Sequence, residues 1–294
     1  MTRKFGRFVV SLSLAATYAC GSAAQETSSS SASIPKVLQI TREFVKPGKA
    51  GMAHDRSESA FVDAMTRAKW PTHYIGMTSL SGKSRALYLT SYESFEAWQK
   101  DTEAVAKNAT LSAALERAAV ADGELLDSLD QGEFYFRNEM SLHPRADLSQ
   151  MRYMELILFH VRPGKEKQWT EVVNMAKAGY EKGVPGAHWG MFEQIYGGEG
   201  GSYLLLISHK TLAEIDKGFA DDKQFEAAMG EDGMKKFGDL YAECCESSQH
   251  QLFAFNPHQS YVQEEWIKAD PSFWKPKSVA PSAKAPAKEK KPNP

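Results

Sequence analysis

The chain has 294 residues, with 35 lysines and arginines against 37 aspartates and glutamates, and a formal net charge of −2. Three of the basic residues lie in residues 1–24, and residues 275–294 contain six lysines and one glutamate. The remaining body, residues 25–274, therefore has 26 basic and 36 acidic residues, a net charge of −10. A body this acidic, without a cluster of basic residues, argues against nucleic acid as a partner.

The first 24 residues have the layout of an export signal. Basic residues come first, the apolar run FVVSLSLAA follows, and small residues precede the polar stretch QETSSSSAS. We predict a signal peptide over residues 1–24, a flexible linker over 25–35, and a periplasmic or extracellular protein. A lipoprotein acylated at Cys20 is the alternative. The apolar run is shorter than the ~20 residues that a membrane span needs, so we predict no transmembrane segment in the mature chain.

The first predicted unit covers residues 36–145. It begins with the strand KVLQITREFV, which ends at the turn FVKPGK. A helix with apolar residues at helical spacing follows and ends at KWP, because proline and the residue before it resist continuing a helix. Two strands then form a hairpin through SGKS. A helical stretch from residue 93 to about 128 and the aromatic strand EFYFRN complete the unit.

The second predicted unit covers residues 150–262 and has the same elements in the same order. Its first strand, YMELILFHV, ends at HVRPGK, its hairpin turns through GGEGGS, and its last strand is QLFAFN. Five equivalent landmarks of the two units lie 114 to 118 positions apart. A spacing this constant indicates an internal duplication.

Each unit reads β-α-β-β-α-β, which is the ferredoxin-like order. Two helices cover one face of such a sheet and leave the other face bare. The predicted fold is therefore α+β, with two tandem ferredoxin-like units whose antiparallel sheets pack together as an intrachain α/β barrel. The lumen of that barrel is the predicted ligand pocket.

The element order, the basic-Pro-Gly-Lys turn after the first strand and the expected pairing of two sheets resemble the dimeric α/β-barrel superfamily. The turns VKPGK and VRPGK are most similar to those of its NIPSNAP-like members. The resemblance implies a cofactor-independent monooxygenase or a haem-binding protein. The sequence lacks the first-strand asparagine with a downstream tryptophan and histidine that marks the haem-degrading branch. We therefore expect no cofactor, with haem the less favoured alternative.

Side chains alternate between the two sides of a strand, which divides the opening strands into two sets. The mainly apolar set is expected to pack on the helices: Leu38, Ile40, Phe44, Met154, Leu156 and His160. The mixed set is expected to line the lumen: Gln39, Thr41, Glu43, Glu155, Ile157 and Phe159.

His188 and Trp189 are the strongest catalytic and binding candidates, opposite His73 and Tyr74 of the first unit. His188 could act as a general base beside Glu155 or Glu193, and Trp189 could stack on a flat ligand. The alternative is that one of the pair fills the core and the other lies at a strand end. His54 and His160 lack an evident second ligand, so we predict no metal site.

Two function classes remain. The first is a protein that binds a small apolar or aromatic molecule in the lumen, with a cofactor-independent monooxygenase as its enzymatic form. The second is a non-catalytic, exported interaction module with a filled barrel. The Pro/Ala/Lys-rich tail, residues 275–294, is predicted to be disordered. The composition is compatible with an oligomer and assigns no role to Cys244 and Cys245.

Overall fold

The computed structural model describes residues 34–275. The predicted signal peptide, nearly all of the predicted linker and all but the first residue of the predicted tail lie outside this range. Among the described residues, no helix combines the length and the apolar character that crossing a membrane requires.

The first half contains four strands and three long helices. In chain order they are β1 (Val37–Val45), α1 (Met52–Ala68), β2 (Tyr74–Ser79), β3 (Arg85–Tyr92), α2 (Phe95–Lys107), α3 (Ala109–Gly123) and β4 (Leu126–Phe136). The helical stretch predicted as one is two helices, because Asn108 ends α2 and its side chain accepts a hydrogen bond from the Leu111 amide at the start of α3.

The second half repeats this order. Its elements are β5 (Tyr153–Val161), α4 (Glu166–Gly183), β6 (Gly190–Tyr196), β7 (Ser202–His209), α5 (Ala213–Cys244) and β8 (Cys245–Phe255). The long helix α5 is kinked at Gly230, where φ is 70°. Both Pro-Gly-Lys turns place their glycine at positive φ, 78° at Gly48 and 79° at Gly164, which explains why each first strand ends there.

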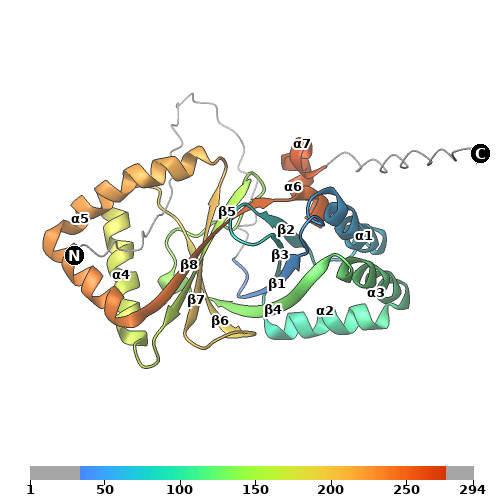
Figure 1. Ribbon diagram of the computed structural model, residues 1–294, viewed down its shortest axis with the longest axis horizontal. Helices are drawn as coiled ribbons and strands as arrows, with labels where there is room; N and C mark the ends of the chain where they lie inside the picture. Colours follow the sequence, from blue (N-terminus) through green and yellow to red (C-terminus); the bar gives the residue numbers. More distant parts are fainter. Residues whose placement is uncertain (1–33, 276–294) are drawn as a thin grey trace, which may run out of the picture.

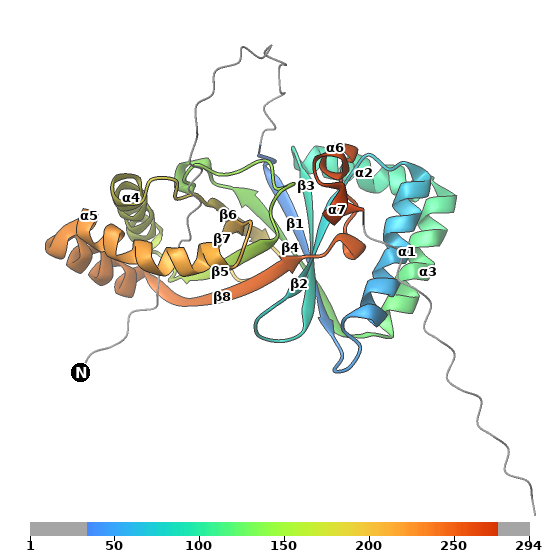
Figure 2. The same cartoon turned by 90° about the horizontal axis from the view of Figure 1, so that it is seen from above.

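The eight strands form one closed antiparallel barrel in the order β1-β3-β2-β8-β5-β7-β6-β4. Pairing of β2 with β8 and of β4 with β6 joins the two halves. Helices lie outside the barrel on both sides, with α1, α2 and α3 against the first half and α4 and α5 against the second (Figures 1 and 2). The predicted fold class is confirmed, while the duplication, the NIPSNAP likeness and the domain boundaries stay predictions.

Apolar side chains from all eight strands fill the interior of the barrel. They include Met77, Leu87, Phe134, Phe192, Leu204 and Phe253. An eight-stranded barrel has an interior about wide enough for side chains to fill. The middle of the lumen is therefore a packed core, and the lumen side chains meet open space at one end of the barrel.

The predicted sides of the opening strands are reversed. The set expected on the helices lies inside the barrel and joins its core: Leu38, Ile40, Met154 and Leu156. The set expected in the lumen faces the helices, as Phe159 does against Trp169 of α4, with ring centroids 5.0 Å apart. The prediction was wrong because alternation along a strand separates its two sides without saying which one faces the helices.

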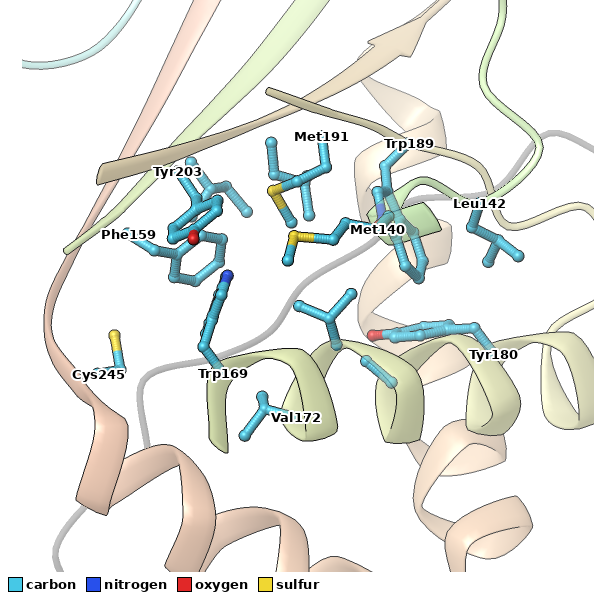
Figure 3. Packing of buried hydrophobic residues seen from close by; sticks show 14 of the residues in the cluster. Met140, Leu142, Phe159, Trp169, Val172, Tyr180, Trp189, Met191, Tyr203 and Cys245 are labelled. Atoms are coloured by element: carbon cyan, nitrogen blue, oxygen red, sulfur yellow. The ribbon is translucent and has the colours of Figure 1, made fainter. Parts of the chain in front are cut away.

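In the second half, a large apolar cluster lies between helices and sheet (Figure 3), and His209 is a buried ionisable side chain on the same side of the sheet. Trp169, Val172, Ala176 and Tyr180 of α4 are fully buried there against β5, β6 and β7. The predicted apolar stripe of this helix is confirmed.

In the first half, the same layer has a different composition. The apolar cluster there has only three buried members, Ala64, Trp70 and Leu111. The buried residues of α1 are His54, Glu58 and Ala64. The first half therefore covers its sheet partly with ionisable groups, and this is where the candidate site lies.

Two short helices that the sequence did not predict follow β8. They are α6 (Glu264–Ala269) and α7 (Pro271–Trp274), and they lie beside one end of the barrel (Figure 2). The indole nitrogen of Trp274 donates a hydrogen bond of 2.7 Å to the Ser149 carbonyl oxygen. This contact ties the C-terminal end of the described chain to the connection between the halves.

Candidate functional site

Four ionisable side chains meet between the helices and the sheet of the first half. They are Glu43 from β1, His54 and Glu58 from α1, and Asp122 from α3, and we call them the buried cluster. One nitrogen or oxygen of each lies within 4.8 Å of those of the others. Their exposed fractions are between 2% and 6%, so the cluster is almost completely removed from water.

His54 is the centre of the contacts within the cluster. Its Nε2 atom lies 3.0 Å from Oε2 of Glu43 and 3.6 Å from Oδ1 of Asp122. On the other side of the ring, Nδ1 lies 3.1 Å from the amide nitrogen of Gln259, which also donates to Asp55 at 2.9 Å. The ring is thereby held between a carboxylate and an amide.

Part of the cluster lacks hydrogen-bond partners. Oε1 of Glu58 and the hydroxyl group of Tyr74 nearby are buried without a hydrogen-bond partner. Oδ1 of Asp122 also has no hydrogen bond, since its contact with Nε2 of His54 is 3.6 Å long. Burial, and then the carboxylates of Glu43 and Asp122, raise the pKa of Glu58 to about 9. Buried polar groups in native proteins are normally satisfied, so unpartnered oxygens in a group of three carboxyls point to a function other than stability.

A pocket of about 500 Å³ leads to the cluster, and we call it the helix–sheet pocket. Glu43, Glu58 and Asp122 form part of its wall. The remaining wall is mainly apolar and aromatic, with Phe61, Met65, Tyr74, Tyr88, Leu126 and Leu129 among its residues. A mainly apolar pocket with a few converging polar groups is the usual form of a small-molecule site.

A second cavity, of about 1140 Å³, lies at one end of the barrel. Leu38, Leu89, Met154, Phe192 and Leu206 from inside the barrel contribute to its wall, and Trp266 of α6 covers it from outside. The predicted ligand residues His73 and Tyr74, and the predicted base His188, also line this cavity. These three candidates are therefore close to open space, but at the end of the lumen.

His188 does not have the contacts of a general base. Its Nε2 atom lies 3.0 Å from the carbonyl oxygen of Ser208, and Nδ1 lies 3.3 Å from that of Gly186. Burial, and then the positive charge of Arg145, lower its pKa to about 4. With this pKa the ring is neutral at pH 7, and both of its nitrogens lie beside backbone carbonyl oxygens.

The predicted partners of His188 have other neighbours. Oε1 of Glu155 lies 2.9 Å from Nε2 of His209, and Glu193 accepts a hydrogen bond of 2.6 Å from Nε of Arg137. Trp189 is buried in the helix-side core and donates its indole hydrogen to the Met140 carbonyl oxygen at 2.9 Å (Figure 3). The arrangement of a base, an acid and a stacking ring is not formed by these residues.

The lumen residues predicted on β1 lie instead on the helix side. Gln39 contacts Glu133 of β4 at 3.5 Å, and Thr41 accepts a hydrogen bond of 3.0 Å from Gln131. Thr41 and Glu43 do line a pocket, but it is the helix–sheet pocket. These two residues were chosen for the wrong side of the sheet and nevertheless reach the candidate site.

Sequence reasoning missed Glu58, Asp122, Tyr88 and Gln259. A signal was present for Glu58, because His54 and Glu58 are four residues apart and such pairs share one side of a helix. Asp122 and Gln259 carry no comparable local signal, since they lie 68 and 205 positions from His54.

The remaining candidates lie elsewhere in the structure. His160 has an exposed carboxylate beside it, Glu199 at 3.5 Å. Cys244 and Cys245 are buried and free.

No family model matches the sequence, and no match was found among curated proteins. Among solved structures, the chain is similar to a "Putative monooxygenase" from Fusobacterium nucleatum, with 10% identity, a TM-score of 0.51, and coverage of 76% of this chain and 93% of the other. An anthrone oxidase-like protein has 13% identity, a TM-score of 0.49, and coverage of 80% and 97%. A chlorite dismutase from Candidatus Nitrospira defluvii, in complex with cyanide, has 10% identity, a TM-score of 0.46, and coverage of 80% and 95%. The first likeness supports the α/β-barrel fold.

The expectation that the protein needs no cofactor is contradicted. The described residues contain four buried side chains in an arrangement that can hold a metal ion. The expectation rested on the missing asparagine, tryptophan and histidine pattern of the haem-degrading branch, which says nothing about other ligands. The four residues come from three elements, β1, α1 and α3, that only the fold brings together.

Proposed function

We propose that this protein is an enzyme acting on a small, mainly apolar molecule, with the helix–sheet pocket as its active site and oxygenation as its reaction class. One observation carries the proposal: the closed side of a mainly apolar pocket contains the buried cluster, with two carboxyl oxygens that have no partner. Buried carboxyl oxygens without hydrogen-bond partners lower the stability of the folded protein. Such costly groups are common in active sites, where they take part in the reaction. The fold is shared with a protein described as a monooxygenase.

The pocket indicates the class of substrate. Its aromatic and apolar wall, including Phe61 and Tyr88, suits a flat hydrocarbon skeleton. Its inner end presents carboxyl oxygens, which accept hydrogen bonds and repel anions. The substrate that fits is therefore a neutral aromatic molecule with one or more hydroxyl groups.

The test uses hydroxylated naphthalenes and anthrones as probes with the purified mature chain. We expect binding in calorimetry and oxygen consumption in a closed electrode cell. Ala119→Trp, an exposed position on α3 at the pocket wall, should weaken binding by obstructing the pocket while leaving the four cluster residues in place. Ser208→Ala, at the barrel-end cavity, is the control and should bind as the unmodified protein does.

Two results would count against the proposal. Equal probe binding by Ala119→Trp and the unmodified protein would place the ligand elsewhere. Binding without oxygen consumption, for every probe, would remove oxygenation and leave a binding protein. The predicted export remains a separate proposal, and fractionation of cells that express the full chain would test it.

A further inference from the structure

We propose that the buried cluster is a site for one divalent transition-metal ion, with Glu43, His54, Glu58 and Asp122 as the protein ligands. This inference rests on the proposed function, because the ion would face the helix–sheet pocket and supply the chemistry there. The four donors come from β1, α1 and α3, and His54 and Glu58 are one turn apart on the same helix. Rigid elements hold all of them, as a metal site requires.

The unpartnered oxygens are independent support for a ligand. Glu58 is 3% exposed and Asp122 is 2% exposed, and each has one buried carboxyl oxygen without a hydrogen-bond partner. A cation would satisfy both oxygens at once. No lysine or arginine within residues 34–275 makes an ion pair with Glu43, Glu58 or Asp122. The protein therefore supplies no positive charge of its own beyond the imidazole.

The second half shows that the fold does not need such a cluster. Glu43 and Phe159 occupy the same place, two residues before the end of the first strand of their half. Phe159 packs on Trp169 in an apolar cluster. His209, which is buried on the same side of the sheet, contacts the two carboxylates of Glu155 and Glu214. Burying three carboxyls in the equivalent layer costs hydration free energy that an apolar layer avoids. A bound cation accounts for this difference between the halves.

The ligand set selects the class of ion. Carboxylates and an imidazole suit first-row divalent ions such as Mn²⁺, Fe²⁺ and Co²⁺. A nitrogen ligand disfavours Ca²⁺ and Mg²⁺, which prefer oxygen ligands alone, and the cluster contains no cysteine for soft ions. Three of the ligands line the pocket, so a coordination position on that side would be open to water or substrate.

Gln259 is a positioning residue for this site. Its amide group lies 3.1 Å from Nδ1 of His54 and also contacts Asp55 on the same helix. A metal ion on Nε2 requires the ring hydrogen on Nδ1, so in the metal-bound form Gln259 would present its side-chain oxygen, rather than its nitrogen, to Nδ1. The turn after β8 thereby helps to orient a ligand on α1.

The experiment measures metal binding by the mature chain after treatment with a chelator. Co²⁺ and Mn²⁺ are the probes, with calorimetry for affinity and stoichiometry and visible absorption for Co²⁺. We expect one equivalent per chain, and a higher melting temperature with metal. Glu58→Gln and Asp122→Asn keep the side-chain volume and should each weaken binding by about tenfold or more. Gln259→Ala should weaken binding less and change the Co²⁺ spectrum.

Matched controls separate this site from others. Glu155→Gln removes a carboxylate beside a buried histidine in the second half, and His160→Ala removes the histidine beside Glu199. Both should bind one equivalent with unchanged affinity. Ala119→Trp should still bind the metal ion but should no longer bind the aromatic probes. A failure of the proposed substrate pocket and a failure of the proposed metal site would therefore give different results.

The proposal is overturned if the stripped protein, with an unchanged circular dichroism spectrum, binds no Co²⁺ or Mn²⁺ at millimolar concentration. It is also overturned if Glu58→Gln and Asp122→Asn bind as tightly as the unmodified chain, or if His160→Ala alone abolishes binding. If Glu58→Gln or Asp122→Asn does not fold, the variant that does fold is compared with the unmodified chain. A smaller increase in its melting temperature with metal supports the proposal, and an equal increase overturns it.

Discussion

Nε2 of His54 on α1 lies 3.0 Å from Oε2 of Glu43 on β1, and both side chains are almost completely buried. The contact crosses the layer between helix and sheet that the other half fills mainly with apolar side chains. Ionisable groups in such a layer lose hydration, and their mutual attraction recovers only part of it. Variants of the cluster therefore measure what the burial of these groups costs in free energy of unfolding.

Glu58→Gln should stabilise the chelator-treated protein by about 1–3 kcal/mol, because it removes a carboxyl that is buried beside two others. Glu155→Gln should have the opposite effect, a loss of about 1–3 kcal/mol, because it removes the partner that lies 2.9 Å from His209. Urea unfolding at pH 7.5 measures both changes. A larger loss for Glu58→Gln than for Glu155→Gln would show that the cluster is a stabilising network.

His188 should make stability depend on pH. Its folded pKa is lowered from 6.5 to about 4 by burial and by Arg145, with a smaller contribution from His209. Between these values the unfolded chain binds more protons than the folded one, so stability is complete above pH 6.5 and falls as the pH approaches 4. In His188→Gln this part of the fall should be missing. Melting temperatures from pH 4 to 7.5 test this, and equal slopes for both proteins would contradict it.

Gly76→Ala should destabilise the protein by about 1–3 kcal/mol through overpacking. A β-carbon at Gly76 would lie 2.2 Å from the carbonyl oxygen of Gln259, which is backbone and cannot turn aside. The change would also displace Gln259 from His54. Gly123→Ala, at the end of α3, meets no atom within 4 Å and is the control, with a gain of up to about 1 kcal/mol. Equal effects of the two substitutions would contradict the close approach at Gly76.

Trp169→Ala should cost about 3–5 kcal/mol, because the side chain is fully buried among Phe159, Tyr203 and the rest of the apolar layer. Trp98→Ala on α2 is the comparison, since Trp98 is only partly buried and should cost less. Thermal unfolding followed by circular dichroism gives both values. Similar losses at the two positions would show that the second half is not the more tightly packed one.

The order of elements could be predicted because it depends on local signals. Pro-Gly-Lys turns, strand alternation and the apolar stripe of α4 each act within a few residues, and β-α-β-β-α-β followed from them twice. The boundary between α2 and α3 at Asn108 was not predicted, because a single asparagine in a run of helical spacing fits a polar position on the surface of one continuous helix. The helices α6 and α7 were also missed, because they are short and held by tertiary contacts such as that of Trp274 with Ser149.

The candidate site was predicted only in fragments. Thr41 and Glu43 were chosen, but alternation along a strand separates two sides without saying which one is inside. His188 and Trp189 were chosen for their chemistry, and in the structure both contact backbone carbonyl groups, while their catalytic and binding roles stay predictions. The helical spacing of His54 and Glu58 was the one local signal of the cluster that could have been used.

The sequence by itself determined the eight strands, the helices that connect them and the closure of two halves into one barrel, because these follow from short-range periodicity and from the need to cover a bare sheet. Only the tertiary structure decided which side of each strand lies inside, and that Glu43, His54, Glu58 and Asp122 meet. The physical reason is that burial and electrostatics act through space: residues 79 positions apart along the chain become neighbours in a layer without water.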